Sequence, residues 1–314
     1  MLGWFHPMRP SSITVLFATA VISTSFFCAS MHAHAAACCG GGSASPSTIT
    51  SDDLAQVSAS FSLSEIVVDN VDSSGFWRRS DVHQTIKTYK LQGARLLSDR
   101  WQAGLVFPVM SRERLGEQHS GVGDIAGTLG YEFLPDWNYN PIRPKGIGFL
   151  QITLPGGISR YESSIGGLDS TGNGFLAFSL GSVFTKTWNA IDAVLLIEAH
   201  RSFSKNVQTS IGQVELDPDF GGDISIGAGY NLGDLRMGGM ITWSVEDAVK
   251  IVSANASSDG SVERYATANL SLSYLFSEQW AGTLTYTDQT WFGDPINTSL
   301  GRGGAIQVQR KWTR

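Results

Sequence analysis

Two ionisable side chains, Glu198 and His200, stand two positions apart in a run of alternating apolar and polar residues. A spacing of two places both side chains on the same face of a β-strand. A carboxylate beside an imidazole can attract cations or act as an acid/base pair, and Asp223 begins a later alternating run. Such groups can also form a hydrogen-bonded network that stiffens a wall. Their chemistry therefore depends on the strands that carry them.

Alternation runs through the whole chain from residue 53 onward. Twelve runs of about ten residues place apolar side chains at every second position, which is the period of a β-strand. The first run carries its apolar members at Ala55, Val57, Ala59, Phe61 and Leu63. The sequence therefore predicts an all-β chain of twelve strands.

Composition excludes several classes of protein. Charged residues make up 16% of the 314 residues, hydrophobic residues 42% and aromatic residues 11%, and acids outnumber bases by 28 to 22. So many aromatics and so few charges exclude a disordered chain. The acidic balance excludes a basic nucleic-acid binder, so no nucleic-acid partner is expected. Only one segment, at the N-terminus, is long and apolar enough to suggest a membrane helix.

The connections between the runs alternate in length. Tight turns lie at 98–100, 187–189, 231–234 and 277–279, and a longer connection rich in proline covers 134–145. Six long polar loops lie near 70–84, 110–121, 155–173, 201–220, 246–264 and 288–302. Short turns at one end and long loops at the other are typical of a transmembrane antiparallel up-and-down β-barrel with an even number of strands.

Tryptophans and the polar face support a barrel in the outer membrane of a Gram-negative-type bacterium. Tryptophans fall at both ends of the runs, where interfacial aromatic belts are expected: Trp101, Trp137, Trp188, Trp280 and Trp312 near the turns, and Trp77, Trp243 and Trp291 near the loops. The alternative, a soluble β-barrel or sandwich, would carry many Lys and Glu residues on its polar face. Here that face is mostly Ser, Thr, Gln, Asn and Gly.

The first 52 residues precede the predicted barrel. Arg9, an apolar run from residue 13 and Ala33-His34-Ala35 predict a signal peptide over 1–35. Residues 36–52 are then a Cys-, Gly- and Ser-rich flexible tail, and 53–314 the barrel. The adjacent pair Cys38-Cys39 allows lipidation, metal capture or no role beyond the tail, and we favour the last.

The inward face follows from the parity of the strands. Its predicted ionisable, pore-lining members are Lys90, Asp124, Glu132, Asp192, Glu198, His200, Asp223 and Arg236, together with Lys311 near the C-terminus. We expect Glu198, His200 and Asp223 to meet near the external mouth, and Arg236 to join Glu132 and Asp192 nearer the periplasm. The inner face also holds apolar residues, which form a hydrophobic ladder or fill the lumen: Val106, Phe149, Phe175, Val194, Leu196 and Met240.

Enzymatic chemistry is not expected. A lipase in such a barrel needs a Ser and a His within hydrogen-bond reach at the membrane-facing wall. Beyond the predicted signal peptide the histidines are His83, His119 and His200; two lie in predicted loops and the third points inward. No catalytic residue, metal site or cofactor is therefore predicted.

Four stretches resemble the outer-membrane family of the MetA pathway of phenol degradation. Gly121-Val122-Gly123-Asp124 resembles its Gly-x-Gly-Asp signature, and the segment 150–157 resembles its strand ending in Leu-Pro-x-Gly. Thr171-Gly172-Asn173-Gly174 is similar to its Gly-x-Gly strand opening, and 101–108 to a strand ending in proline. The resemblance covers about residues 89–200. It implies an outer-membrane channel or transporter-like barrel for small molecules, among them hydrophobic or aromatic compounds.

The C-terminus departs from the usual pattern. Outer-membrane barrels generally end on an aromatic residue that the insertion machinery reads, whereas this chain ends Lys311-Trp312-Thr313-Arg314, and Arg310 interrupts the apolar face. We still expect insertion by that machinery, with membrane lipids and small-molecule cargo as the other partners. The alternative to a channel is a plugged structural or surface barrel whose long external loops bind partners.

Overall fold

The computed structural model describes residues 46–79, 82–209, 212–253 and 257–314. The signal peptide and most of the tail predicted above lie outside these residues. The described residues belong to one compact unit. Among them, no helix is long and apolar enough to cross a membrane.

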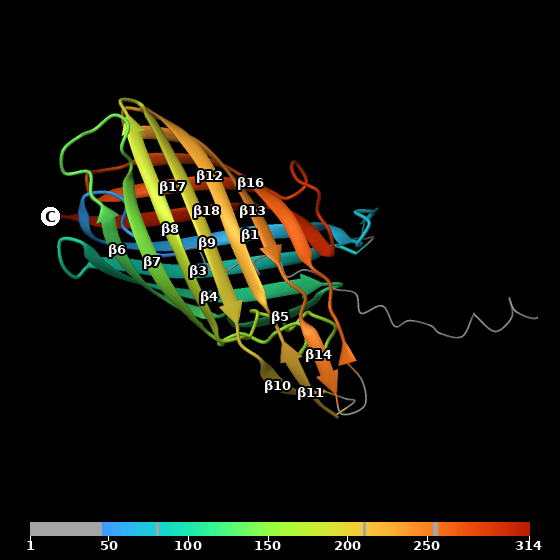
Figure 1. The fold of residues 1–314 in the computed structure, drawn as a ribbon. Coiled ribbons are helices and arrows are strands. Elements are labelled where there is room, and N and C mark those ends of the chain that lie inside the picture. The colour runs from blue at the N-terminus through green and yellow to red at the C-terminus, as the bar shows by residue number, and fades with distance from the viewer. Residues whose placement is uncertain (1–45, 80–81, 210–211, 254–256) are drawn as a thin grey trace, which may run out of the picture. The chain divides into compact units, whose positions relative to one another are not determined.

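Twelve antiparallel strands form the barrel wall. Their bounds are β1 (Asp53–Val71), β3 (Gln84–Leu96), β4 (Trp101–Arg114), β6 (Ile125–Leu134), β7 (Lys145–Leu154), β8 (Ala177–Trp188), β9 (Ile191–Ser202), β12 (Phe220–Leu232), β13 (Leu235–Glu246), β16 (Glu263–Leu275), β17 (Trp280–Asp288) and β18 (Thr298–Thr313). Each strand pairs with its neighbours in chain order, and β18 returns to pair with β1 (Figure 1). This closure confirms the predicted twelve-stranded up-and-down barrel.

The first and last strands close the barrel over a long ladder. Pairing runs from Asp53 opposite Thr313 to Val71 opposite Thr298, with bulges near both ends. No open sheet edge is therefore left in the barrel, as a membrane-spanning sheet requires. The chain begins β1 and finishes β18 at the short-turn end, where Figure 1 marks the C-terminus.

Side chains alternate between the two faces of the wall as the sequence predicts. The outer face is apolar and exposed, as at Leu91 (53%) and Leu105 (56%). The inner face is polar and buried, as at Gln102 (2%) and Gln151 (0%). An apolar exterior around a polar interior is the reverse of a soluble barrel and is typical of a transmembrane one. Of the tryptophans that the structure describes at the two ends of the wall, seven are exposed and Trp312 is half-buried.

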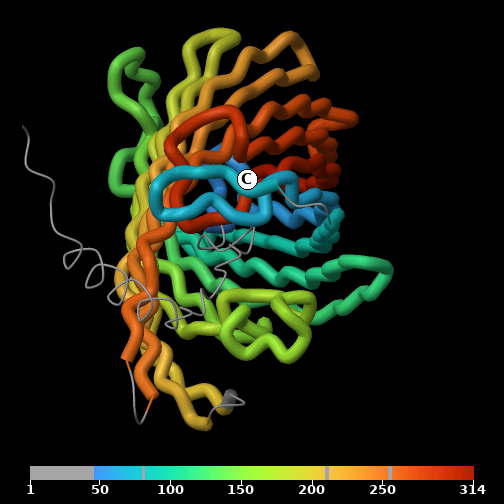
Figure 2. Tube along the Cα trace, turned by 90° about the vertical axis from the view of Figure 1, so that its right-hand side faces the viewer, coloured from blue at the N-terminus to red at the C-terminus, as the bar shows by residue number. Residues whose placement is uncertain are grey.

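The long loops contain more regular structure than the sequence predicts. Six short strands extend them: β2 (Trp77–Arg78), β5 (Glu117–Val122), β10 (Lys205–Thr209), β11 (Gly212–Asp217), β14 (Lys250–Ser253) and β15 (Ser257–Ser258). Four of these form a separate sheet in the order β10-β11-β14-β15, which projects beyond the barrel (Figures 1 and 2). Val207, Val214 and Leu216 pack against Phe175 beneath this sheet. The loops fold because they have an apolar core of their own.

Candidate functional site

Acidic side chains gather inside the barrel at the long-loop end. Asp223 of β12 lies directly opposite Glu198 of β9. His200, also on β9, lies between two carboxylates: its Nδ1 is 3.1 Å from Glu198 Oε2, and its Nε2 is 3.0 Å from Glu246 Oε2. The predicted meeting of Glu198, His200 and Asp223 is therefore present, and Glu246 of β13 joins it.

A glycine at position 221 makes room for this arrangement. Gly221 faces His200 across the strand pair, and a Cβ at this position would overlap both the His200 ring and the Glu246 carboxylate. The Ser244 hydroxyl donates to Asp223 Oδ1 and fixes that carboxylate against β13. Tyr265, on the next strand, is opposite Ser244 and buried. The acids are thus held by neighbours on four adjacent strands.

One oxygen in the cluster has no hydrogen-bond partner. The Glu198 side chain is 1% exposed, and its Oε1 is a buried acceptor without a donor. An unpaired buried carboxylate oxygen is costly, and positive charge nearby lowers that cost. Among the described residues, no three His, Cys, Asp or Glu side chains are arranged to hold a metal ion. The excess of carboxylates at this end of the interior produces an electrostatic potential that attracts cations.

A fourth carboxylate, Glu263, stands opposite Glu246 at the start of β16. Glu263 accepts a hydrogen bond from Thr298 at 2.9 Å and lies 3.7 Å from the Arg160 guanidinium. We call Glu198, Asp223, Glu246 and Glu263 the mouth cluster. Glu246 and Glu263 were not predicted as members of this site, because they fall in the predicted loop 246–264. Two-residue alternation assigns inward and outward faces only within a strand.

Asp124, predicted as a pore-lining residue, binds the backbone of a loop. Its Oδ1 accepts from the N–H groups of Gly156 (3.1 Å) and Gly157 (3.0 Å). Its Oδ2 accepts from Asn173 (2.6 Å) and Gly174 (3.0 Å). One carboxylate therefore ties together both ends of the loop 155–176, which connects β7 to β8.

The glycines around Asp124 allow this close contact. A Cβ at Gly172 would lie 2.7 Å from the Asp124 carboxylate, and one at Gly123 would lie 3.0 Å from Thr171 O. Thr171 also donates its hydroxyl to Val122 O at 2.9 Å. Three of the four stretches that carry the family resemblance, around residues 121–124, 154–157 and 171–174, thus meet at one carboxylate.

A second set of contacts fixes the middle of the same loop. Lys205 Nζ, at the start of β10, lies 2.7 Å from Glu162 Oε2 and donates to Gly174 O at 2.9 Å. Burial alone would raise the pKa of Glu162, but hydrogen bonds from Lys205 and Ser159 and the Lys205 charge outweigh it and hold that pKa below its usual value. Asp169 likewise accepts hydrogen bonds from Ser163 and Ser164. Hydrogen bonds and an ion pair therefore hold this loop in place at the long-loop end of the barrel.

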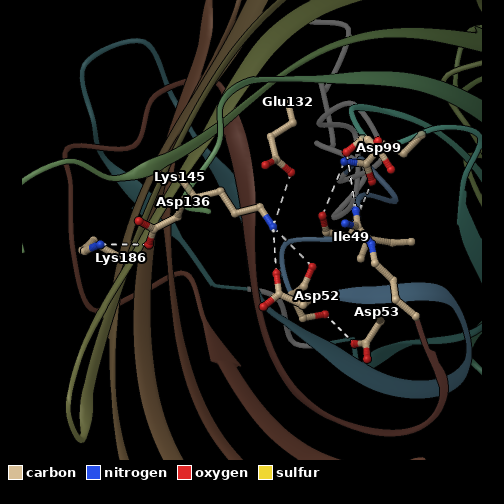
Figure 3. A network of polar contacts seen from close by, with 11 residues as sticks. Ile49, Asp52, Asp53, Asp99, Glu132, Asp136, Lys145 and Lys186 are labelled. Carbon is tan, nitrogen blue, oxygen red and sulfur yellow. Dashed lines mark hydrogen bonds and ion pairs between the residues drawn. The ribbon is translucent and has the colours of Figure 1, made fainter. Parts of the chain in front are cut away.

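At the short-turn end, Arg236 and Glu132 belong to separate charge pairs, where the sequence predicts one network. Arg236 Nε donates to Asp192 Oδ2 at 2.8 Å, and Asn231 adds a bond at 2.9 Å. Glu132 does not join them, because Lys145 lies 3.4 Å from its carboxylate (Figure 3). The prediction was wrong about Glu132 because the sequence assigned no face to Lys145, which begins β7.

Residues 46–49 are buried or half-buried against the wall at this end and residues 50–52 are exposed, whereas the sequence places all of 46–52 in a flexible tail. Ile49 is 1% exposed; its N–H donates to Gln102 Oε1 at 2.6 Å. Ser47 donates to Gly93 O at 3.0 Å, and Lys145 to Ser51 O at 3.3 Å. A Cβ at Gly104 would overlap Ser47 O. The wall is therefore shaped to receive this segment.

The apolar inner residues do not form one continuous ladder. Val106 (1%) and Phe149 (3%) are buried inside the wall, and the Phe149 ring lies over Gly181, where a side chain would overlap it. Phe175 instead packs in the core of the loop sheet. Val194 and Leu196 are half-buried, and Met240 is exposed.

Two inward lysines differ in their surroundings. Lys311 lies 3.8 Å from Asp53. Lys90 is half-buried on β3, and no carboxylate of the described residues lies within ion-pair distance of it. The interior thus places an unpaired cation on one wall and an excess of acids on another.

A closed antiparallel barrel with an apolar outer face, exposed tryptophans at both ends and a polar interior defines the class of transmembrane β-barrels. The structure is similar to the COG4313 outer membrane channel from Pseudomonas putida F1, with a TM-score of 0.65 and 11% identity over 84% of this chain and 99% of that chain. At this identity the likeness is one of fold.

Two further solved structures were found at lower similarity. The NanC porin has a TM-score of 0.43 and 10% identity over 82% of this chain and 99% of that chain. The TodX monoaromatic hydrocarbon channel deltaS2 mutant has a TM-score of 0.42 and 11% identity over 86% of this chain and 93% of that chain. No family model and no curated protein sequence matches the chain.

Proposed function

We propose that this chain is an outer-membrane channel that passes small molecules and favours cations. The mouth cluster carries the proposal: four carboxylates face one guanidinium and one imidazole, and a buried oxygen of Glu198 is unpartnered. Acidic rings in a low-dielectric passage attract cations and repel anions. The COG4313 channel, which shares the fold, is described as an outer membrane channel.

We also propose membership of the MetA-pathway family, with hydrophobic or aromatic compounds among the cargo. The support is structural. Asp124 accepts hydrogen bonds from two of the other stretches that resemble the family, so three of the four stretches are in direct contact with one another. The half-buried inner residues Val194 and Leu196 give the passage an apolar side.

Single-channel recording tests the proposal. The chain from residue 36 onward, refolded and placed in a planar bilayer across a salt gradient, is expected to give stable current steps with a reversal potential of the cationic sign. The double variant Glu198→Gln with Asp223→Asn should reduce that potential. Asp259→Asn, which removes a charge from an exposed loop residue, is the matched control. An unchanged reversal potential in the double variant would contradict the proposal that the mouth cluster selects cations.

A second candidate function, a plugged surface barrel, is favoured by the segment 46–52. Its residues 46–49 are buried or half-buried against the wall, with hydrogen bonds to Gly93 and Gln102. In that case the loop sheet β10-β11-β14-β15 provides the contact surface. Its apolar core gives the loops the fixed shape that partner binding requires.

Removal of residues 36–50 separates the two candidates. A channel in which the segment only narrows the passage should conduct before and after the deletion, with larger steps afterwards. A plugged barrel should be silent until the segment is removed. Heat-modifiable migration on a gel checks that both proteins are folded.

A further inference from the structure

An open apolar groove lies on the outer face of the barrel, across β1, β3 and β4. Its volume is about 700 Å³, within the range of sites that hold small ligands. The groove exists because its floor has small residues, among them Ala55, Gly93 and Ala103, while Leu105 and Phe107 form its sides. Trp312 lies at its short-turn end.

Two arginines flank this groove at the short-turn end. Arg95 of β3 is opposite Ala55 of β1, and Ala55 is opposite Trp312 of β18. Arg310 is opposite Val57, so the two arginines are separated only by β1. Neighbouring strands lie about 4.8 Å apart and each residue advances about 3.4 Å along a strand, so the two Cα positions, two strands and two residues apart, are about 12 Å from each other. Both side chains are exposed.

These arginines differ from Lys186 of β8. Lys186 is 5% exposed and lies 2.9 Å from Asp136. Among the described residues, neither Arg95 nor Arg310 has a carboxylate within ion-pair distance. Arg310 instead lies over the rings of Trp280 (5.5 Å) and Trp312 (4.9 Å). A stacked guanidinium keeps its N–H edge available for a planar, bidentate contact with phosphate.

We propose that this groove binds one glycerophospholipid with an anionic headgroup, taken from the periplasmic leaflet. The phosphate and headgroup lie between Arg95 and Arg310, and an acyl chain follows the floor toward Leu105. The proposal rests on the outer-membrane location given under the proposed function. It explains the arginine that interrupts the apolar face of the last strand, because that arginine completes a binding site.

A second outer groove provides an internal comparison. It lies over β6, β7, β8 and β9, has a volume of about 760 Å³ and is equally apolar, with Gly148 and Phe184 among its lining residues. No arginine or lysine lines it. Acyl chains can occupy both grooves, but only the first is expected to select the charge of the headgroup.

Native mass spectrometry of the whole chain in detergent tests the proposal without any need for channel activity. The probes are dioleoyl phosphatidylglycerol and dioleoyl phosphatidylethanolamine, mixed in equal amounts. The wild type should retain one phosphatidylglycerol in preference. A basic residue near a membrane surface favours an anionic lipid by about fivefold, so Arg95→Gln with Arg310→Gln should lower the preference roughly 25-fold. Equal retention of both lipids by the wild type, or an unchanged preference in the double variant, overturns the proposal.

A pair of glycine variants tests the groove itself. A Cβ at Gly93 would lie 3.5 Å from Val57 Cγ2, and one at Gly148 would lie 3.6 Å from Phe133, both ordinary contacts. Gly93→Leu fills the first groove and should abolish retention of phosphatidylglycerol. Gly148→Leu fills the second and should leave it unchanged. Heat-modifiable migration checks that the Gly93→Leu protein is folded. If the folded variant retains phosphatidylglycerol like the wild type, the groove is not the lipid-binding site. Loss of conductance in any variant bears on the channel proposal and not on this one.

Discussion

Asp124 shows how much one side chain can fix at the residue scale. It accepts four backbone N–H groups from two segments that are separated by a whole loop. Hydrogen bonds to a charged group contribute about 1.5–3 kcal/mol each, less where solvent reaches them. A half-buried carboxylate with four donors therefore dominates the local stability of the loop.

The first prediction concerns this carboxylate. Asp124→Asn removes the charge and turns one acceptor oxygen into a donor that faces two N–H groups, at a cost of about 2–3 kcal/mol. Hydrogen exchange of residues 155–176 should become faster, while β12 and β13 exchange as before. Equal exchange in this loop would show that other contacts hold it.

The second prediction is a pH dependence of the same loop. Because the folded-state pKa of Glu162 is lowered from 4.5, its stabilising effect is complete above pH 4.5 and is lost as the pH falls through the folded value. A spin label at Ile165→Cys, with Cys28, Cys38 and Cys39 replaced by Ser, should gain mobility on acidification. In Glu162→Gln the label should be mobile at neutral pH already.

The sequence predicted the mouth residues only in part. Parity placed Glu198, His200 and Asp223 correctly, because two-residue alternation alone decides which face a strand residue occupies. It could not find Glu246 or Glu263, which lie where strands extend beyond the predicted span. It also could not foresee the partners of Asp124, because backbone donors in a loop depend on contacts distant in sequence.

At the scale of elements, the segment 46–52 and strand β4 fit each other. Gly104 has no side chain where Ser47 O lies against the wall. Gln102 both donates to and accepts from Ile49. The segment belongs to a stretch rich in Gly and Ser, and for this reason it was predicted to be flexible.

The third prediction follows from that fit. Gly104→Ala introduces a methyl group that overlaps Ser47 O, so the segment should leave its position and the single-channel conductance should rise. Gly127→Ala is the control, because nothing lies within 4 Å of a Cβ there. An unchanged conductance together with unchanged exchange at residues 46–52 would mean that the wall adjusts instead.

At the scale of the whole molecule, the outer face must meet lipid. Leu195 lies in the middle of β9 on this face, opposite Phe184 and Ile226. The number and order of strands were predictable because turn length and alternation repeat around the barrel. The loop sheet was not, because its strands are short and pair between two different loops.

The fourth prediction tests the membrane assignment. Leu195→Lys should destabilise the folded barrel by about 2–4 kcal/mol, as for a cation at the bilayer midplane. Denaturant unfolding in lipid vesicles measures this change, with Asn206→Lys on the exposed loop sheet as the control. A Leu195→Lys protein that is folded and soluble without detergent would contradict the assignment.

The Asp124 contact also has a consequence for how the barrel is assembled. The carboxylate receives its four donors only when β6, β7 and β8 have paired in the correct alignment. A slip of one residue between these strands would turn Asp124 toward the lipid and leave the four N–H groups without an acceptor. The contact is thus compatible with only one alignment of these strands. Among relatives of this chain, Asp124 and Gly172 should accordingly be kept or lost together.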